Sequence, residues 1–383
     1  MRLLYLHHIP LNEDRANIVQ VLQMCHAFQQ VGVDVTLATP VGTKYTSESE
    51  MYKIIQRKMG KTPNFKVKRL SNFTIAGRLK AMGTHFGVKS LLRHNGDTDY
   101  CFARASFVTH LAVGCGMKTI YESHGAVINS RTKLLDYMYR RWLLRDTKSP
   151  HLALFVTISS ALADIWKKRG VPAAKILTLH DGFSAEDYDS VSSRNQAREI
   201  LGIRPENKIV VYAGSLYKDR GIENILWLAK AFSNVGFYVV GGPESDKSFY
   251  KALAARKGLN NVFFVGLVPH CRVKDYLFAA DVLLMLWTDK VGTIDVCSPL
   301  KVFEYMAAEK IIVGYGFPTI REVLRDGETA LLAAPNSYQD LERKIRYALS
   351  LDYPNKMAHR ARKVALERYS WKKRAEAIIE RVR

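Results

Sequence analysis

A lysine and a glutamate lie three residues apart in the stretch SPLKVFEYMAAEK, residues 298–310. Ser298 followed by Pro299 is typical of an N-cap with proline at the first helical position, which predicts that a helix starts here. The free N–H groups of a helix start favour a phosphate, and Lys301 adds a full positive charge. Glu304 would lie about 4.5 Å further along the axis on nearly the same face. This spacing fits a diphosphate at the helix start and a ribose diol on the carboxylate.

Glu304 also has a purely structural interpretation. A glutamate in an amphipathic helix commonly pairs with a nearby lysine, and both Lys301 and Lys310 are close in sequence. Such a pair would only keep the helix soluble. The isolated residue does not decide between the two interpretations.

Two histidines follow the first apolar run of the chain. His7 and His8 come directly after LLYL, so they are candidates for contact with an acceptor substrate. They are not spaced as a metal site, and no third ligand is evident in the sequence. The five cysteines form no CxxC pair. We therefore expect neither a zinc site nor a disulfide framework, and a reducing compartment such as the cytoplasm.

The elements that must position these residues alternate along the chain. Short β-rich runs begin at residues 3, 33, 65, 118 and 154, and a second series begins at 209, 237, 262, 281 and 310. Helix-length amphipathic stretches separate them, which predicts parallel sheets covered on both faces. Two series predict an α/β protein with two doubly wound, Rossmann-like domains facing a cleft. Ligands in such folds bind beyond the carboxyl ends of the strands.

Length and composition are those of a two-domain globular protein. The chain has 383 residues, of which 48% are apolar and 24% are charged. Gly, Ser and Asp gather at residues 179–195, where we expect the joint. The predicted domains are therefore residues 1–180 and residues 181–365.

The net charge of +21 is concentrated in the first half of the chain. Residues 1–180 hold 26 Lys and Arg against 11 Asp and Glu, whereas residues 181–383 hold 31 against 25. Between Met51 and Gly96 there are eleven basic residues and no acidic one. Such a segment attracts phosphate, either on anionic lipid or on nucleic acid. A solvated basic face without a partner is the alternative.

Part of this basic segment has the pattern of an interfacial helix. Residues 73–92 place Ile75, Leu79, Met82 and Phe86 at helical spacing beside basic residues. A helix packed on its own sheet would show the same pattern. No apolar run approaches the roughly 20 residues of a spanning helix, and the N-terminal run is too short for a signal peptide. We expect a cytoplasmic protein, peripherally associated with a membrane face.

Six segments resemble, in order, the motifs of the retaining GT-B glycosyltransferases of family 4. They are TIYESHGAV at 119–127, LFVTISSALADIWKKRGVPAAKILTLHDGF at 154–183, VVYAGSLYKDRGIENILWLA at 210–229, VFFVGLVPHCRVKDYLFAADVLLMLW at 262–287, SPLKVFEYMAAEKIIVGYGFPTIREVL at 298–324 and YSWKKRAEAI at 369–378. The resemblance covers nearly the whole chain. It implies the GT-B fold, with an N-terminal acceptor-binding domain completed by a C-terminal helix at residues 366–383. The second domain would bind the nucleotide-sugar donor.

The resemblance also implies a reaction and a set of roles. A sugar would pass from a UDP- or GDP-sugar to a lipid-linked or membrane-borne glycan, with retention and without metal or cofactor. His124 would contact the transferring sugar, and Arg220 and Lys301 would neutralise the leaving diphosphate. The donor residues implied are Gly214, Ser215, Lys218, Arg220, Val268, His270, Ser298, Pro299, Leu300, Lys301 and Glu304, with the backbone of 267–270 reading the base. Those implied near the acceptor are His7, His8, Arg15 and Asn17.

The sequence departs from the family pattern at three places. Val296, with Asp295 beside it, stands where the family usually has a second glutamate. Ser215 replaces a basic residue of the phosphate-binding turn, and Arg15-Ala16-Asn17 replaces a glycine pair. The donor sugar therefore does not follow from the motifs.

Two alternatives to this transferase remain open. One is a glycosyltransferase or binding protein directed at nucleic acid, which would use the same surplus charge. The sequence holds no helix-turn-helix, zinc-finger or RNP-like motif to support it. The other is a GT-B sugar-nucleotide epimerase, which would not need a broad basic acceptor face.

Overall fold

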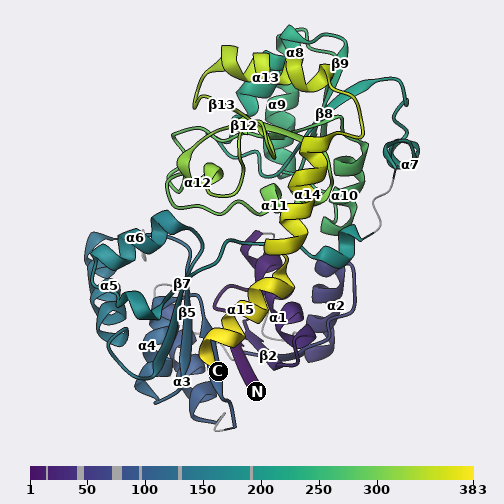
Figure 1. Ribbon diagram of the computed structural model, residues 1–383. Helices are drawn as coiled ribbons and strands as arrows, with labels where there is room; N and C mark the ends of the chain where they lie inside the picture. Colours follow the sequence, from purple (N-terminus) through teal and green to yellow (C-terminus); the bar gives the residue numbers. More distant parts are fainter. Residues whose placement is uncertain (14–15, 41–46, 71–79, 95–96, 128–131, 190–192) are drawn as a thin grey trace. The chain divides into compact units, whose positions relative to one another are not determined.

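The computed structural model describes residues 1–13, 16–40, 47–70, 80–94, 97–127, 132–189 and 193–383, with only the backbone at residues 16 and 80–84. The chain divides into two compact units, each an α/β assembly (Figure 1). The first comprises Met1–Asp181 together with Trp371–Arg383. The second comprises Gly182–Ser370.

The first unit is built on a parallel sheet with the strand order β3-β2-β1-β4-β5-β6-β7. Its strands are β1 (Arg2–Leu6), β2 (Asp34–Thr39), β3 (Lys66–Arg69), β4 (Tyr100–Ala103), β5 (Thr119–Ser123), β6 (Leu152–Thr157) and β7 (Ile176–Thr178). Side chains of the central strands are buried on both faces, as expected where helices cover both sides of a sheet. Strands β2 and β3 lie on one side of β1, and the strands from β4 onward lie on its other side. The switch point of the sheet is therefore between β1 and β4, and open α/β sheets bind ligands at such switch points.

The strand register brings three prospective site residues to one edge of this sheet. Leu6 pairs with Ala103, so β1 and β4 end together. The next strand, β5, ends at Ser123. His7, Arg104 and His124 each follow directly after one of these strands and therefore lie at the same carboxyl edge.

Helices of the first unit connect these strands. They are α1 (Ala16–Gln30), α2 (Glu48–Met59), α3 (Lys80–Arg93), α4 (Ser106–Gly114), α5 (Lys133–Asp146), α6 (Ser160–Lys168), the short 3-10 turn η2 (Ala173–Lys175) and the C-terminal α15 (Trp371–Val382). Local sequence sets their starts: Ser47 and Glu50 form a reciprocal capping box before α2, and Ser159 caps α6. Helix α15 packs against α1, which fixes the end of the chain to the first unit.

The second unit repeats the plan with the strand order β10-β9-β8-β11-β12-β13. Its strands are β8 (Lys208–Ala213), β9 (Val235–Val240), β10 (Val262–Gly266), β11 (Val282–Met285), β12 (Ile311–Tyr315) and β13 (Leu331–Ala333). Its helices are η3 (Ala185–Tyr188), α7 (Arg194–Leu201), α8 (Ile222–Ala231), α9 (Glu244–Arg256), α10 (His270–Ala279), α11 (Leu300–Ala307), α12 (Pro318–Arg321), α13 (Tyr338–Ser350) and α14 (Lys356–Arg368). The switch point lies between β8 and β11.

The predicted fold class, two doubly wound Rossmann-like domains, is confirmed. The ten predicted strands are present, and three further strands, β4, β7 and β13, were not predicted. These three strands are only three or four residues long. Runs that short carry too little alternation or β-branching by themselves, whereas the four-residue strands β3 and β11 were predicted because the alternating or apolar pattern continues into their flanking residues.

None of the helices in the described ranges is long and apolar enough to cross a membrane. Of the predicted interfacial helix at 73–92, the part from Lys80 onward is helical in α3. Phe86 is half exposed there. Ile75 and Leu79 lie outside the described residues, and only the backbone of Met82 is described.

Candidate active site

A pair of close glycines follows the central strands of the second unit. Gly214, directly after β8, has a φ of 154°, and a Cβ added there would lie 2.7 Å from Nζ of Lys301. A Cβ on Gly241, directly after β9, would collide with the Gly214 carbonyl. Glycine at both positions lets the backbone and the lysine approach closely at the switch point, as phosphate-binding turns require.

The amine of Lys301 is buried without an anionic partner among the described residues. Its Nζ lies 3.9 Å from the centroid of the Tyr212 ring and has no hydrogen-bond partner among the described residues. Burial, reinforced by the positive charge of Arg220, lowers its pKa well below the usual value for lysine. A buried ammonium is costly unless an anion pairs with it. The position therefore favours binding of a negatively charged ligand.

Arg220 is held in place from a second side of the switch point. The turn before it contains Asp219 with a φ of 70°, and the Asp219 carbonyl accepts a 2.9 Å hydrogen bond from Oγ1 of Thr288. The guanidinium lies 4.5 Å from the centroid of the Trp287 ring. One of its terminal nitrogens is buried without a hydrogen-bond partner in the described part of the chain. Arg220 and Lys301 thus both present unsatisfied donors in the same region.

Helix α11 supplies a third attraction for an anion. It begins at Leu300, with Pro299 as the N-cap in an extended conformation at a φ of −76° and a ψ of 117°. The prediction that Ser298 caps the helix is therefore wrong by one residue, because Pro299 keeps an extended ψ instead of entering the helix. The first-turn N–H groups at Leu300 and Lys301 have no partner within the helix. They remain available for a phosphate.

Glu304 pairs with a histidine and not with either predicted lysine. Its Oε1 lies 2.8 Å from Nε2 of His270, the first residue of α10. Burial lowers the pKa of His270, but the Glu304 charge and hydrogen bond outweigh it and the net shift is upward. Lys310 instead lies 4.1 Å from the centroid of the Tyr353 ring, with no hydrogen-bond partner among the described residues. The suggested Lys301 or Lys310 pair is therefore not formed.

Other residues of the expected donor site are less directly engaged. The Ser215 carbonyl accepts a 2.9 Å hydrogen bond from the Tyr212 hydroxyl. Lys218 is exposed and makes no ion pair with the described residues. Val268 is half-buried in the connection between β10 and α10. Asp295 is exposed, whereas Val296 is buried.

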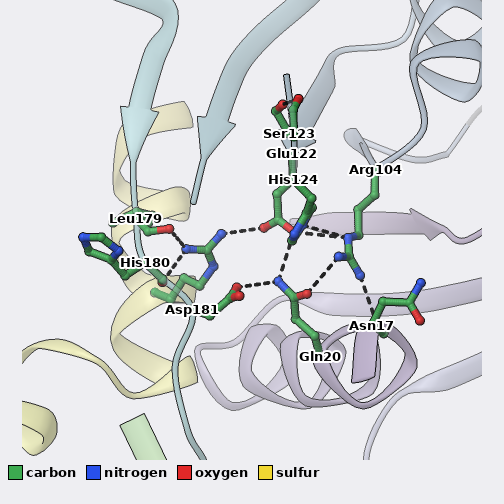
Figure 2. Close-up of polar contacts among 11 residues, drawn as sticks. Asn17, Gln20, Arg104, Glu122, Ser123, His124, Leu179, His180 and Asp181 are labelled. Carbon is green, nitrogen blue, oxygen red and sulfur yellow. Dashed lines mark hydrogen bonds and ion pairs between the residues drawn. The ribbon is translucent and has the colours of Figure 1, made fainter. Parts of the chain in front are cut away.

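The first unit contains a separate polar cluster at the carboxyl edge of its sheet (Figure 2). Glu122 is fully buried, and its Oε1 lies 2.5 Å from Nε2 of His124 and 3.3 Å from Nε of Arg104. Burial, with the Arg104 charge, lowers the pKa of His124 to about 4. Burial alone would raise the pKa of Glu122, but Arg374, His124 and Arg104 hold it below its usual range. At neutral pH the cluster therefore contains a neutral imidazole beside a charged carboxylate.

Three further side chains complete this cluster. Arg374 of α15 donates to Oε2 of Glu122 at 2.6 Å and also to the carbonyls of Leu179 and His180. Gln20 donates to Asp181 at 2.6 Å and accepts from Arg104 at 2.8 Å. Burial, with the Glu122 charge, raises the pKa of Asp181 to about 7. The cluster thus joins α1, β4, β5, α15 and the end of the first segment of the unit.

The expected acceptor residues lie beside this cluster. His7 is 2% exposed, and neither of its ring nitrogens has a partner in the described part of the chain. Nδ1 of His8 and Oδ1 of Asn17 are likewise buried without a described partner. Burial, with the Arg104 charge, lowers the pKa of His7 and brings that of His8 to about 4. Arg15 lies outside the described residues.

Each unit also contains polar or aromatic residues of its own cluster that were not predicted from the sequence. Tyr212 and Trp287 hold the two cations, and Glu122 with its two arginines holds His124. One signal was visible, because Glu122 is a lone acid inside the apolar strand TIYES. Among the described residues, no group of three His, Cys, Asp or Glu side chains could hold a metal ion.

Comparison with known proteins finds similarity to glycosyltransferases. The family model of glycosyl transferases group 1 matches residues 193–368. The chain is 25% identical over 268 residues to lipopolysaccharide 1,2-N-acetylglucosaminetransferase of Salmonella typhimurium, across 67% of this chain and 68% of that protein. It has the same identity to the uncharacterized glycosyltransferase MJ1069 of Methanocaldococcus jannaschii, across 67% of this chain and 65% of that protein.

Solved structures show the same fold along the whole chain. Anabaena HepE in complex with UDP superposes with a TM-score of 0.76 at 16% identity, covering 99% of both chains. Sucrose-phosphate synthase from Thermosynechococcus elongatus gives a TM-score of 0.75 at 15% identity, covering 99% of this chain and 98% of that one. These structural likenesses establish the GT-B fold. Within this fold, residues 193–368 of the second unit carry the sequence match to the glycosyl transferases group 1.

Proposed function

We propose that this glycosyltransferase moves a sugar from a nucleoside-diphosphate donor to a hydroxyl acceptor with retention of the anomeric configuration. The observation that carries the proposal is the pair of basic side chains Lys301 and Arg220, each of which has a buried nitrogen without a hydrogen-bond partner among the described residues. A departing diphosphate develops negative charge, and preorganised cations stabilise that charge most effectively in a buried site. The start of α11 adds backbone donors for the same group.

The remainder of the donor site suits a nucleoside. Glu304 is mostly buried and already oriented by His270, so its carboxylate can accept hydrogen bonds from a ribose diol. The base would lie against the backbone of residues 267–270. HepE has been solved with UDP and with UDP-glucose, which supports a nucleotide-sugar donor, here a UDP- or GDP-sugar. The proposed reaction uses no metal and no resident cofactor.

The first unit would bind the transferring sugar and the acceptor. His124 is neutral and partly exposed, and the buried polar atoms of His7, His8 and Asn17 need hydrogen-bonding partners that a hydroxylated substrate can supply. The acceptor would attack from the face that the diphosphate leaves, without a protein nucleophile. The Salmonella relative is a lipopolysaccharide transferase, which supports a lipid-linked or membrane-borne glycan as the acceptor.

We further propose that the first unit docks on an anionic membrane face at the cytoplasm. Helix α5 presents Leu134, Tyr137 and Met138 to solvent, with Arg141 exposed on the same side of the helix. Apolar side chains beside basic ones are typical of interfacial helices. The basic residues between Met51 and Gly96 add charge that anionic headgroups attract.

Product analysis with matched variants tests the transferase proposal. The parent should release UDP or GDP from at least one nucleotide sugar, and NMR of the product should show the anomeric configuration of the donor. Lys301→Met and Arg220→Met should each lower turnover roughly ten- to a thousandfold, since one such contact is worth about 1.4 to 4 kcal/mol. Lys310→Met removes another buried lysine on an aromatic ring and should leave turnover unchanged.

Three outcomes would replace the proposal. Conversion of a nucleotide sugar into its epimer without transfer would identify an epimerase. Labelling of DNA or RNA in preference to glycans would favour the nucleic-acid alternative. Unchanged kinetics in both cation variants would remove the assigned diphosphate site.

A further inference from the structure

Glu122 is a buried carboxylate for which neither the diphosphate site nor the acceptor residues provide a role. It belongs to β5, two residues before His124, and has no exposed surface. Arg374, Arg104, His124 and Gln20 all direct nitrogen atoms toward its two oxygens. A buried charge with this many partners is costly to assemble, and an apolar residue would suit an inner strand of a parallel sheet better. A functional use of the charge is therefore expected.

The geometry fixes the position of the proton on His124. An ionised carboxylate can only accept hydrogen bonds, so the 2.5 Å contact requires a proton on Nε2 of the imidazole. Nε of Arg104 lies 3.0 Å from the same nitrogen but cannot donate to it once it carries a proton. Arg104 then donates to Oε1 of Glu122, 3.3 Å away. All three groups are satisfied only in this arrangement (Figure 2).

The other ring nitrogen of His124 is left as an acceptor. The side chain is 26% exposed, and Nδ1 has no hydrogen-bond partner among the described residues. A neutral imidazole with its proton on Nε2 carries a lone pair on Nδ1. Such a nitrogen accepts a hydrogen bond from a hydroxyl, whereas it would repel a phosphate or carboxylate oxygen.

Arg374 extends this arrangement to the C-terminal helix. Its side chain is 3% exposed and reaches Oε2 of Glu122 at 2.6 Å from α15. The same guanidinium binds the Leu179 and His180 carbonyls. The carboxylate is thus held on one oxygen by α15 and on the other by β4, and it cannot rotate away from the histidine without losing an arginine.

We propose that Glu122 and Arg374 are positioning residues that fix His124 with its proton on Nε2, so that Nδ1 accepts a hydrogen bond from a hydroxyl of the substrate sugar. The proposal rests on the glycosyltransferase function proposed above. It assigns His124 the role of a neutral acceptor, not that of a cation facing the diphosphate. The chemical class selected at this point is a hydroxyl donor, so a deoxy or O-methyl sugar at the contacted position should be a poor substrate.

The direct test is the tautomer of His124 in the folded full-length protein. In protein labelled with ¹⁵N-histidine, long-range ¹⁵N–¹H correlation spectra distinguish a protonated Nε2 from a protonated Nδ1. The His124 signals are assigned by their loss in His124→Asn. We expect the parent to carry the proton on Nε2 from pH 6 to pH 8. A proton on Nδ1, or a charged ring in that range, would overturn the proposal without any activity measurement.

Two variants add a kinetic readout. Glu122→Gln and Arg374→Met should shift the tautomer equilibrium of His124 and lower kcat roughly ten- to a thousandfold, the size of effects seen when a catalytic histidine loses its orientation. Their affinity for UDP or GDP should stay unchanged, because the diphosphate residues belong to the second unit. If the parent itself binds neither UDP nor GDP, the proposed function is contradicted, but the tautomer of His124 measured by NMR remains valid.

A matched carboxylate–histidine pair provides the control. Asp146 is buried and lies 3.0 Å from Nδ1 of His110 in the same unit. Asp146→Asn should change the His110 signals and lower stability, yet leave kcat and the His124 spectrum as in the parent. If Glu122→Gln changes kcat no more than Asp146→Asn does, Glu122 has only a structural role. If Glu122→Gln fails to fold, the spectrum of the parent alone decides the tautomer.

Discussion

Lys301 should acquire a proton when a nucleotide binds. Burial and Arg220 depress its pKa in the free protein, whereas a bound diphosphate would favour the charged form. Binding of UDP or GDP should therefore be accompanied by proton uptake at alkaline pH, and affinity should fall as pH rises. Calorimetry in two buffers of different ionisation enthalpy measures the uptake.

The control for this prediction is another buried lysine. Lys310→Met should retain the proton uptake, since Lys310 lies beside Tyr353 and away from the turn at Gly214. Lys301→Met should abolish it. Equal enthalpies in the two buffers for the parent would mean that no buried amine changes charge on binding.

Glu304 should distinguish a ribose from a deoxyribose. A charged acceptor is worth about 1.5 to 3 kcal/mol, so the parent should bind UDP or GDP roughly ten- to a hundredfold more tightly than the 2′-deoxy nucleotide. Glu304→Gln should weaken binding of the ribonucleotide and nearly remove this difference. The measurement is the Kd of both nucleotides for both proteins. A variant that keeps the full preference would show that another group reads the ribose.

Single residues also show which contacts could be predicted from the sequence and which could not. Lys301, Arg220 and Glu304 could be identified because a local pattern, the start of a helix, gives each a chemical role. His270 was expected to contribute only its backbone, and its side chain proves to orient Glu304. That contact joins two helices separated in sequence. No periodicity within either helix could predict it.

At the level of helices and strands, the polar cluster makes part of the first unit sensitive to pH. Burial raises the pKa of Asp181 to about 7, well above the ordinary value of about 3.9. The folded state therefore binds this proton more tightly than the unfolded state. The resulting stability is fully present below about pH 4 and is lost as the pH rises through 7.

Asp181→Asn tests this dependence without removing the hydrogen bond from Gln20. The asparagine carbonyl can still accept from Gln20 but cannot ionise. Relative to the variant, the free energy of unfolding of the parent should fall between pH 5 and pH 8 by about 3 kcal/mol. Urea denaturation at several pH values measures it, with Asp164→Asn as an exposed control. If the free energies of unfolding of the parent and of Asp181→Asn change in parallel with pH, the pKa of Asp181 is not raised in the folded state.

Elements differ in how well the sequence predicts them. Long strands and amphipathic helices were found because their periods of 2 and 3.6 residues persist over several turns or pairs. The start of α11 was misplaced by one residue because proline is compatible with both an N-cap and a first helical position. Arg374 lies 252 residues from Glu122, so the cluster that both residues share follows from tertiary packing and not from any local signal.

For the whole molecule, the uneven charge predicts a salt-dependent association with anionic vesicles. Each basic residue near such a surface contributes about 1 kcal/mol, within a Debye length of about 8 Å at physiological salt. Reversing the exposed Arg57, Lys68 and Arg141 to Glu should weaken vesicle binding at least tenfold, and Leu134→Asp should weaken it further. Co-sedimentation with vesicles of defined anionic content measures the change.

A control variant separates location from net charge. Reversing Lys230, Lys251 and Lys257, which are exposed in the second unit, makes the same change in net charge. It should leave vesicle binding nearly intact. Equal losses in the two triple variants, or equal affinity of the parent for DNA and anionic vesicles, would indicate only a general attraction to polyanions.

The measurement that tests the central claim most directly is the affinity of UDP and GDP for the parent and three single variants. Lys301 and Arg220 are claimed to hold the diphosphate, so Lys301→Met and Arg220→Met should each raise the Kd of the bound nucleotide at least tenfold. Lys310→Met should bind it as the parent does. If the parent binds neither nucleotide, or if all three variants bind with the Kd of the parent, the buried cations do not form a diphosphate site.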